Sequence, residues 1–286
     1  MQISEPAPVV VAVNGNSAGL AATRLGAREA VASGRPLRIV HAFSWPPAFS
    51  PDDPPDYAVA RQDADQLVRV AVDTALRSVP GVRVTGHVAE GDPVRVLLRR
   101  TRTAALLVIG DDGLAATKRL PPSSVLVQAV ARARCPVVVA RGVRPPAGPL
   151  LAAVDGSPCS LLALRFAAAE AVRLSAALEV THVVGGPDGT DAGRALLGEA
   201  IATIGRTPRV SARLLTGDPA ATLVRASRRA RLLLAGPRGT RGPGLLGVVA
   251  AELLLRGACP TVFVHGTSAA RTTPDGTLPT AEALIG

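Results

Sequence analysis

The sequence predicts an α/β protein built from two tandem domains, each an open five-stranded parallel sheet with helices on both faces. The first observation is an internal repeat, because residues 82–113 align on residues 208–239 without a gap. Second, short apolar runs alternate with segments whose apolar residues recur at helical spacing. Third, 48% of the 286 residues are hydrophobic but only 2% are aromatic. This aliphatic composition is typical of parallel sheets that are buried on both faces.

Five strands, with helices between them, are expected in each copy. In the first copy the strands are expected at residues 9–13, 38–43, 83–88, 105–110 and 136–140. In the second copy they are expected from residue 150 onward and at residues 178–184, 209–215, 231–236 and 260–264. Strands that alternate with helices imply crossover connections and a parallel sheet.

Two helix starts carry a specific signal. The motif Gly-Asp-Pro places Asp92 and Asp218 where a carboxylate can accept the free N–H groups of a first helical turn. The proline that follows suits the first helical position. Helix capping therefore explains these aspartates better than a catalytic role does.

The register of the repeat predicts the domain boundaries. Domain 1 is expected at residues 1–143, a Pro/Gly-rich linker at 144–149, domain 2 at 150–266 and a flexible tail at 267–286. No apolar stretch is long enough to span a membrane.

Cysteine usage and charge set expectations about location and partners. The three cysteines form no disulfide framework or metal-binding spacing, and the polar N-terminus does not look like a signal peptide, so a cytoplasmic protein is expected. Cys135 and Cys259 are expected to be small core residues. The net charge of +10 comes almost wholly from scattered arginines, so nucleic acid is not an expected partner.

A glycine-rich loop follows the fourth strand of the first copy, in the segment GDDGLAATKRLPPSS, residues 110–124. Gly110 and Gly113 would let the backbone approach a ligand without a Cβ in the way. Ser123 and Ser124 begin a helix whose free N–H groups attract an anion. Because ligands of open parallel sheets bind where the strand order reverses, this loop predicts a phosphate-bearing ligand.

The glycine loop and the loop that follows the first strand of each copy together resemble the motifs of the universal stress protein family. The resemblance covers residues 7 to 266 and rests on Asp-Gly-Ser after the first strand, a Gly-x2-Gly-x9-Gly-Ser/Thr loop, and Cys-Pro before the last strand. It implies two Rossmann-like (adenine nucleotide alpha hydrolase-like) domains. In nucleotide-binding members of the family, the Asp contacts the adenine base. A residue at the end of the second strand also contacts adenine, through its backbone. The glycine loop holds the ribose and the phosphates of ATP.

The resemblance assigns a set of site residues to each copy. In the first copy they are Asn14, Gly15, Ala42, Gly110, Gly113, Ser123 and Ser124. In the second copy they are Asp155, Gly156, Val183, Gly236, Gly239 and Gly247.

Each copy departs from the family pattern in a different place. Asn14 replaces the Asp of the first copy, so an acceptor is kept but its charge is lost. In the second copy Asp155 is intact, but the loop is two residues shorter and Val248 stands where a hydroxyl is expected. We therefore expect the nucleotide to be held chiefly in domain 1.

Other charged and polar residues have simpler explanations. Lys118 and Arg119 could reach a phosphate chain or be solvated loop charges. Asp111 and Asp112 would repel a phosphate unless Mg²⁺ lay between them, and solvent exposure is the simpler interpretation. His41 and His182 coincide in the repeat at a strand end and are interpreted as structural.

The first copy also carries an insertion at residues 44–58 that holds the only Trp and the only Tyr. It is expected near the adenine end of the site, as surface decoration, a lid or a partner surface.

These observations favour a non-catalytic ATP-binding stress-response module whose two repeats form an intramolecular pseudo-dimer, with a homodimer left open. The last strand of each copy is the candidate edge for that pairing. A slow ATPase that uses Asp111 or Asp112 and Mg²⁺ is one alternative. The other is an interaction module in which both sites bind no nucleotide.

Overall fold

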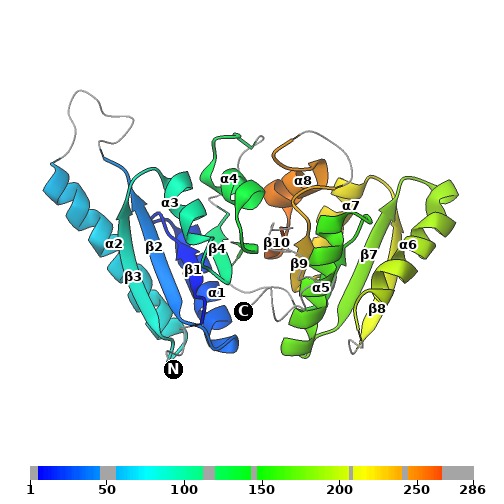
Figure 1. Ribbon diagram of the computed structural model, residues 1–286, viewed down its shortest axis with the longest axis horizontal. Helices are drawn as coiled ribbons and strands as arrows, with labels where there is room; N and C mark the ends of the chain where they lie inside the picture. The colour runs from blue at the N-terminus through cyan, green and yellow to red at the C-terminus, as the bar shows by residue number, and fades with distance from the viewer. Residues whose placement is uncertain are drawn as a thin grey trace, which may run out of the picture. The chain divides into compact units, whose positions relative to one another are not determined.

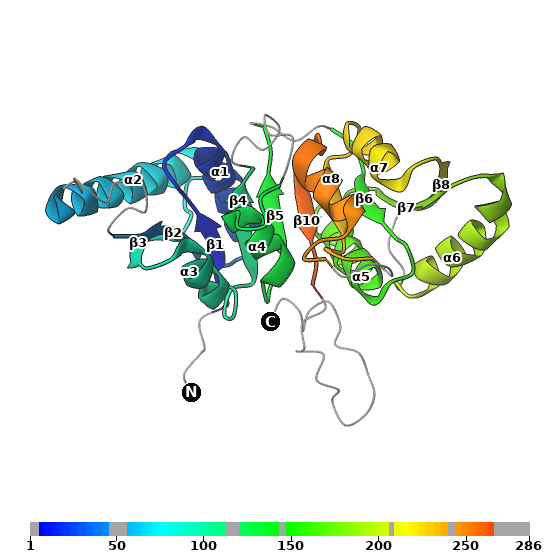
Figure 2. The same cartoon turned by 90° about the horizontal axis from the view of Figure 1, so that it is seen from above.

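The computed structural model describes residues 6–45, 56–111, 120–142, 147–205, 209–239 and 244–265. Two compact units are present. Within the described residues, the first unit contains residues 6–111 and Arg132–Ala140, and the second contains residues 120–131 and 141–265. Each unit carries one parallel sheet with helices on both faces, which confirms the predicted fold class (Figures 1 and 2).

The first unit has the strand order β3-β2-β1-β4-β5. Its strands are β1 (Val9–Ala12), β2 (Leu37–Phe43), β3 (Val84–Glu90), β4 (Leu106–Gly110) and β5 (Val137–Ala140). Its helices are α1 (Ser17–Ala32), α2 (Tyr57–Ser78) and α3 (Pro93–Arg100). Every pairing between neighbouring strands is parallel, and the strand order reverses between β1 and β4.

The second unit repeats this arrangement in the order β10-β9-β6-β7-β8. Its strands are β6 (Leu150–Ala153), β7 (Leu178–Val184), β8 (Val210–Thr216), β9 (Leu232–Ala235) and β10 (Thr261–Phe263). Its helices are α5 (Pro158–Arg173), α6 (Thr190–Ala202), α7 (Pro219–Ser227) and α8 (Val248–Arg256), with a short 3₁₀ turn at Pro187–Gly189. In Figure 2, α7 and α8 cover one face of this sheet and α5 and α6 cover the other.

One helix from the first repeat belongs to the second unit. The helix α4 (Val125–Arg132) lies in the sequence between β4 and β5, but all of it except Arg132 falls in the second unit. A hydrogen bond of 2.5 Å between Nε2 of His265 and the carbonyl oxygen of Val130 ties the helix to that unit. The domain boundary at residue 143, which the sequence repeat predicts, stays a prediction. The compact units do not follow this boundary, because the second unit includes most of α4.

The duplication extends to the pattern of burial. The strands β2 and β7 have the same order of buried and half-buried residues, and the edge strands β3 and β8 share another order with an exposed middle. The central strands β1 and β6 are buried at every position because helices cover both of their faces. The large, fully buried side chains are almost all aliphatic, among them Leu107 and Leu164. The aliphatic composition therefore reflects a core of parallel strands.

Both predicted helix caps are confirmed. Oδ1 of Asp92 accepts a hydrogen bond of 2.9 Å from the backbone N of Arg95, and Oδ1 of Asp218 accepts one of 2.8 Å from Ala221. A cap of this kind stabilises a helix by about 1 kcal/mol. No helix in the described part of the chain is long and apolar enough to cross a membrane.

Candidate functional site

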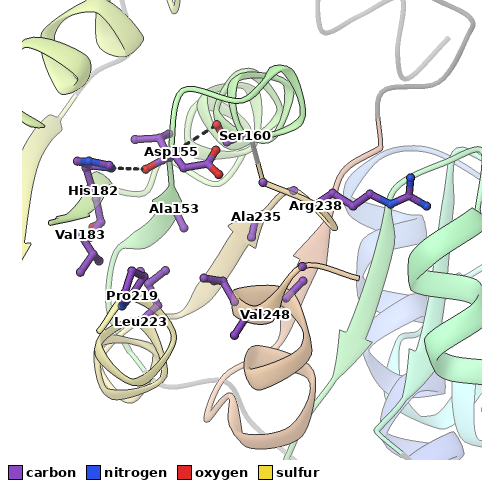
Figure 3. A pocket seen from close by; sticks show the side chains of 17 residues that line it. Ala153, Asp155, Ser160, His182, Val183, Pro219, Leu223, Ala235, Arg238 and Val248 are labelled. Atoms are coloured by element: carbon purple, nitrogen blue, oxygen red, sulfur yellow. Dashed lines mark hydrogen bonds between the residues drawn. The ribbon is translucent and has the colours of Figure 1, made fainter. Parts of the chain in front are cut away.

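A cavity of about 270 Å³ opens at the carboxyl ends of β6, β7 and β9 in the second unit. It lies at the point where the strand order of this sheet reverses, which is where ligands of such folds bind. Figure 3 shows Asp155 and Ser160 on one side of it and Pro219, Leu223 and Val248 on the opposite side. Five of the six site residues predicted for the second copy line this cavity: Asp155, Val183, Gly236, Gly239 and Gly247. The sixth, Gly156, adjoins Asp155 in the chain.

Asp155 is held by a tight turn at the start of α5. Its Oδ1 accepts hydrogen bonds from the backbone N of Ser157 at 3.0 Å and from Oγ of Ser157 at 2.5 Å. Gly156 takes a φ of +79°, a left-handed conformation that favours glycine. Oγ of Ser157 also accepts from the backbone N of Ser160 at 3.2 Å and thereby caps α5. The turn fixes Oδ1 and directs Oδ2 toward the glycine loop, since a Cβ added at Gly239 would lie 2.5 Å from Oδ2.

The first glycine of each loop packs closely against the start of a helix. A Cβ added at Gly236 would lie 2.8 Å from Cβ of Cys159, and one added at Gly110 would lie 2.6 Å from the carbonyl carbon and oxygen of Ala18. The absent side chains therefore make room for the first turns of α5 and α1. Gly236 also lines the cavity, and the approach of a ligand to the backbone at Gly110 stays a prediction.

Two histidines hold the ends of central strands. Nδ1 of His182 lies 2.7 Å from the carbonyl oxygen of Val154, and Nδ1 of His41 lies 2.9 Å from that of Val13. Because a carbonyl oxygen only accepts, each Nδ1 carries a proton and donates it in this bond. Their role is structural, as expected, and specific: each histidine fixes the residue that precedes Asp155 or Asn14. The sequence indicated this role because the two histidines occupy equivalent positions in the two copies.

The start of α8 closes the far side of the cavity. Val248, Val249 and Ala250 line the cavity with the first turn of the helix, and the N-cap residue Gly247 supplies no side-chain cap. The backbone N of Gly247 donates to the carbonyl oxygen of Pro237 at 2.9 Å, which joins the two ends of the loop. A first turn without a side-chain cap presents N–H groups and the positive end of the helix dipole to an anion.

The sequence motifs do not single out Arg238, although it lies between Gly236 and Gly239. It lines the cavity rim, is exposed, and its Nε donates to the carbonyl oxygen of Leu245 at 3.2 Å. Figure 3 shows its side chain directed away from Asp155 and Val248.

The residues predicted for the first copy are not assembled in one unit. Asn14, Gly15, Ala42 and Gly110 lie in the first unit, whereas Ser123 and Ser124 lie in the second. Gly113 lies outside the described residues, as do Asp112, Lys118 and Arg119. The start of α1 does keep the geometry of its counterpart: Oδ1 of Asn14 accepts from the backbone N of Asn16 at 3.4 Å, and Gly15 has a φ of +87°.

Three aromatic rings gather at the two ends of the insertion in the first unit. The ring centroids of Phe43, Trp45 and Tyr57 lie between 5.7 and 6.4 Å apart. The hydroxyl of Tyr57 donates to Oε1 of Glu90 at 2.5 Å, and this bond to the carboxylate raises the pKa of the phenol. Residues 46–55 of the insertion lie outside the described residues.

The two cysteines that precede the last strands are core residues, as predicted. Cys135 and Cys259 are both buried, and removal from water raises the pKa of each thiol to about 12. At neutral pH both are uncharged thiols and poor nucleophiles.

Comparison with known proteins agrees with the resemblance in the sequence. The family model described as the universal stress protein family matches residues 7–141 and again residues 147–265. A universal stress protein of Mycolicibacterium smegmatis is 29% identical over 284 residues, which cover 90% of this chain and 96% of that protein. A universal stress protein of Mycobacterium tuberculosis is 32% identical over 188 residues, which cover 61% and 63% of the two chains.

A solved structure supports the same fold. The crystal structure of a universal stress protein from Archaeoglobus fulgidus matches with a TM-score of 0.71 and 16% identity, over 90% of this chain and 97% of that one. The structural likeness concerns the fold, whereas the family matches to both repeats show that the chain belongs to the universal stress protein family.

Proposed function

We propose that this protein binds an adenine nucleotide reversibly in the cavity of its second unit and acts as a non-catalytic stress-response module. One observation carries the proposal: a carboxylate and the first turn of a helix line the same cavity at the strand reversal. The carboxylate of Asp155 suits the amino group of a base, and the start of α8 suits a phosphate.

The chemistry of Asp155 favours adenine over guanine. Its Oδ1 is occupied by Ser157, so Oδ2 is the atom that can accept from the 6-amino group of adenine. Guanine carries a carbonyl oxygen at that position, and two acceptors would face each other. An unpaired buried acceptor costs about 1–3 kcal/mol. The apolar side chains of Ala153, Leu223 and Ala235 supply a surface for the purine ring.

The serine and histidine side chains near Asp155 have structural roles, which supports a non-catalytic function. The hydroxyl of Ser157 is used in the turn and as the cap of α5, and Nδ1 of His182 is used by the carbonyl of Val154. These groups position Asp155 rather than a reacting atom. The alternative function, a slow ATPase, requires that phosphate release depend on Asp111 or Asp112. An assay of phosphate release by the Asp111→Ala and Asp112→Ala variants would measure this dependence.

The prediction that the first copy binds a nucleotide is separate from this proposal. ATP, with Mg²⁺, remains the nucleotide expected there, and the preference for the first copy stays a prediction because its loop falls largely outside the described residues. A cytoplasmic location and self-association also stay predictions.

The direct test is to identify and titrate the ligand. Mass spectrometry of the supernatant after heating the purified protein should show an adenine compound, and calorimetry with adenosine, adenosine monophosphate (AMP) and guanosine monophosphate should show preference for adenine. Asp155→Ala should weaken binding by roughly 5- to 150-fold, which corresponds to about 1–3 kcal/mol for a lost hydrogen-bond partner.

Asn14→Ala is the matched control, because Asn14 occupies the equivalent turn of the first copy. It should leave binding in the second unit unchanged. Equal affinity of wild type and a folded Asp155→Ala variant for every adenine compound would refute the proposal.

A further inference from the structure

We propose that the outer edge of the sheet in the first unit binds a phosphate-type anion between Arg38, His87 and Arg100. Arg38 lies on β2, His87 lies on the edge strand β3, and Arg100 lies in the last turn of α3. Uptake of one proton by His87 accompanies the binding. This site goes beyond the proposed function, because it lies in the other unit and does not depend on nucleotide binding.

His87 and Arg38 share one face of the sheet. Gly86 faces α2, because a Cβ added there would clash with Val68 of that helix. Neighbouring residues of a strand point to opposite faces, so His87 points away from α2 and toward the face that α3 covers (Figure 2). Arg38 pairs with Thr85, two residues before His87, and therefore lies on the same face as His87.

Arg100 approaches this face from α3. It follows the buried residues Val96 and Leu97 at helical spacing, so it lies on the side of α3 that is turned to the sheet. The three basic groups therefore converge from three elements. Arg38 is the second residue of β2, so the cluster lies toward the amino ends of the strands, away from Ala42 near the carboxyl end.

The second unit shows how close side chains at two of these positions come. Glu179 and Arg213 occupy the positions of Arg38 and His87, because β7 and β8 repeat the register of β2 and β3. There NH1 of Arg213 donates to Oε1 of Glu179 at 3.0 Å. In the first unit the same diagonal places a guanidinium beside an imidazole. Like charges so placed destabilise a sheet, so protonation of His87 is unfavourable without an anion.

The electrostatic surroundings of His87 are positive. Partial burial lowers the pKa of His87, and the charges of Arg100 and Arg38 lower it further. On its own strand, Nε2 of His87 lies 3.3 Å from Oγ1 of Thr85. Glu90, the acidic residue of β3, is used on the α2 side, where it accepts from Tyr57.

A phosphate-type anion suits this cluster better than a carboxylate does. A phosphate ester carries a charge of about −1.5 to −2 and three strong acceptor oxygens. Two guanidinium groups and a protonated imidazole can bond to different oxygens of such an anion. A carboxylate has two oxygens, which a single guanidinium satisfies. The middle of β3 is exposed, so a ligand reaches the site directly from solvent.

Proton NMR of the imidazole rings in the full chain tests the coupling to His87. Sulfate is the probe, because its charge is constant over the pH range in which histidine titrates. Bound sulfate should raise the pKa of His87, since an anion stabilises the protonated ring. By linkage, sulfate should bind roughly threefold or more tightly as the pH falls from about 8 to about 6. His87→Gln identifies the resonance of this ring.

Two adjacent arginines of α3 give matched variants. Arg100→Gln should weaken sulfate binding, read from the titration of His87, by roughly fivefold or more. Arg99→Gln removes the same charge at an exposed position and should change it less than about twofold. The double substitution of Arg38→Glu with His87→Arg copies the ion pair of the second unit. It should abolish the binding that Arg100→Gln weakens, as measured by calorimetry, and raise the melting temperature in anion-free buffer.

Inorganic phosphate and glycerol phosphate distinguish the two sources of the anion. Equal affinity for both would identify the free ion as a sufficient ligand, whereas tighter binding of the ester would identify a phosphorylated metabolite. A titration of His87 that sulfate leaves unchanged would overturn the proposal, as would equal effects of Arg99→Gln and Arg100→Gln. The cations would then serve only to protect an edge strand from pairing. Nucleotide binding that depends on Asp155 is measured separately, so failure of either proposal leaves the other intact.

Discussion

Substitution of Gly110 by alanine tests whether the glycine loops serve helix packing or ligand access. A Cβ at this position would lie 2.6 Å from the backbone of Ala18, and ordinary contacts begin at 3.4 Å. The start of α1 would have to move by roughly 0.8 Å, and it cannot yield as a flexible side chain would. Overpacking of this kind costs about 1–3 kcal/mol. The melting temperature should fall by roughly 3–10 °C in the absence of any nucleotide.

The assay is thermal and urea unfolding of ligand-free protein, followed by circular dichroism. Gly198→Ala is the matched control: Gly198 lies in the interior of α6, and an added Cβ would meet nothing within 4 Å. That variant should be slightly more stable, by about 0.5–1 kcal/mol, because alanine loses less backbone entropy in a helix. Wild-type stability of ligand-free Gly110→Ala, combined with weaker nucleotide binding, would refute the packing explanation and favour ligand clearance.

Three further predictions concern single groups. Asp218→Ala should lower the free energy of unfolding by about 1 kcal/mol in urea titrations because Ala221 loses its cap, and Asp218→Asn should retain most of it. Cys135 and Cys259 should not react with iodoacetamide at pH 8 until the protein is unfolded, because their thiols are buried with a raised pKa of about 12; rapid labelling of native protein at either would contradict this. Tyr57, the only Tyr, should ionise above its usual pKa of 10.0 in a titration of phenolate absorbance, and Glu90→Gln should lower the pKa by removing the carboxylate; an identical titration in both would exclude the hydrogen bond as the cause.

The sequence predicted individual residues of the candidate site but not how the fold brings them together. Asp155 and Gly239 were both expected at a site, yet their contact depends on how β6 pairs with β9 and where each strand ends. Arg238 gave no local signal that could be separated from the many other arginines. Its place at the cavity follows only from the path of the loop between two glycines.

The sequence by itself determined the class of fold, the duplication, the order of strands and helices, and the capping roles of Asp92 and Asp218. Those features depend on interactions between residues that are close in the chain, such as apolar periodicity and a side chain that bonds to the third residue after it. Only the tertiary structure decided that Gly110 accommodates a helix, that α4 belongs to the second unit, and that the cavity forms around Asp155. These outcomes depend on contacts between segments that are far apart in the sequence, and such contacts are set by sheet register and side-chain packing.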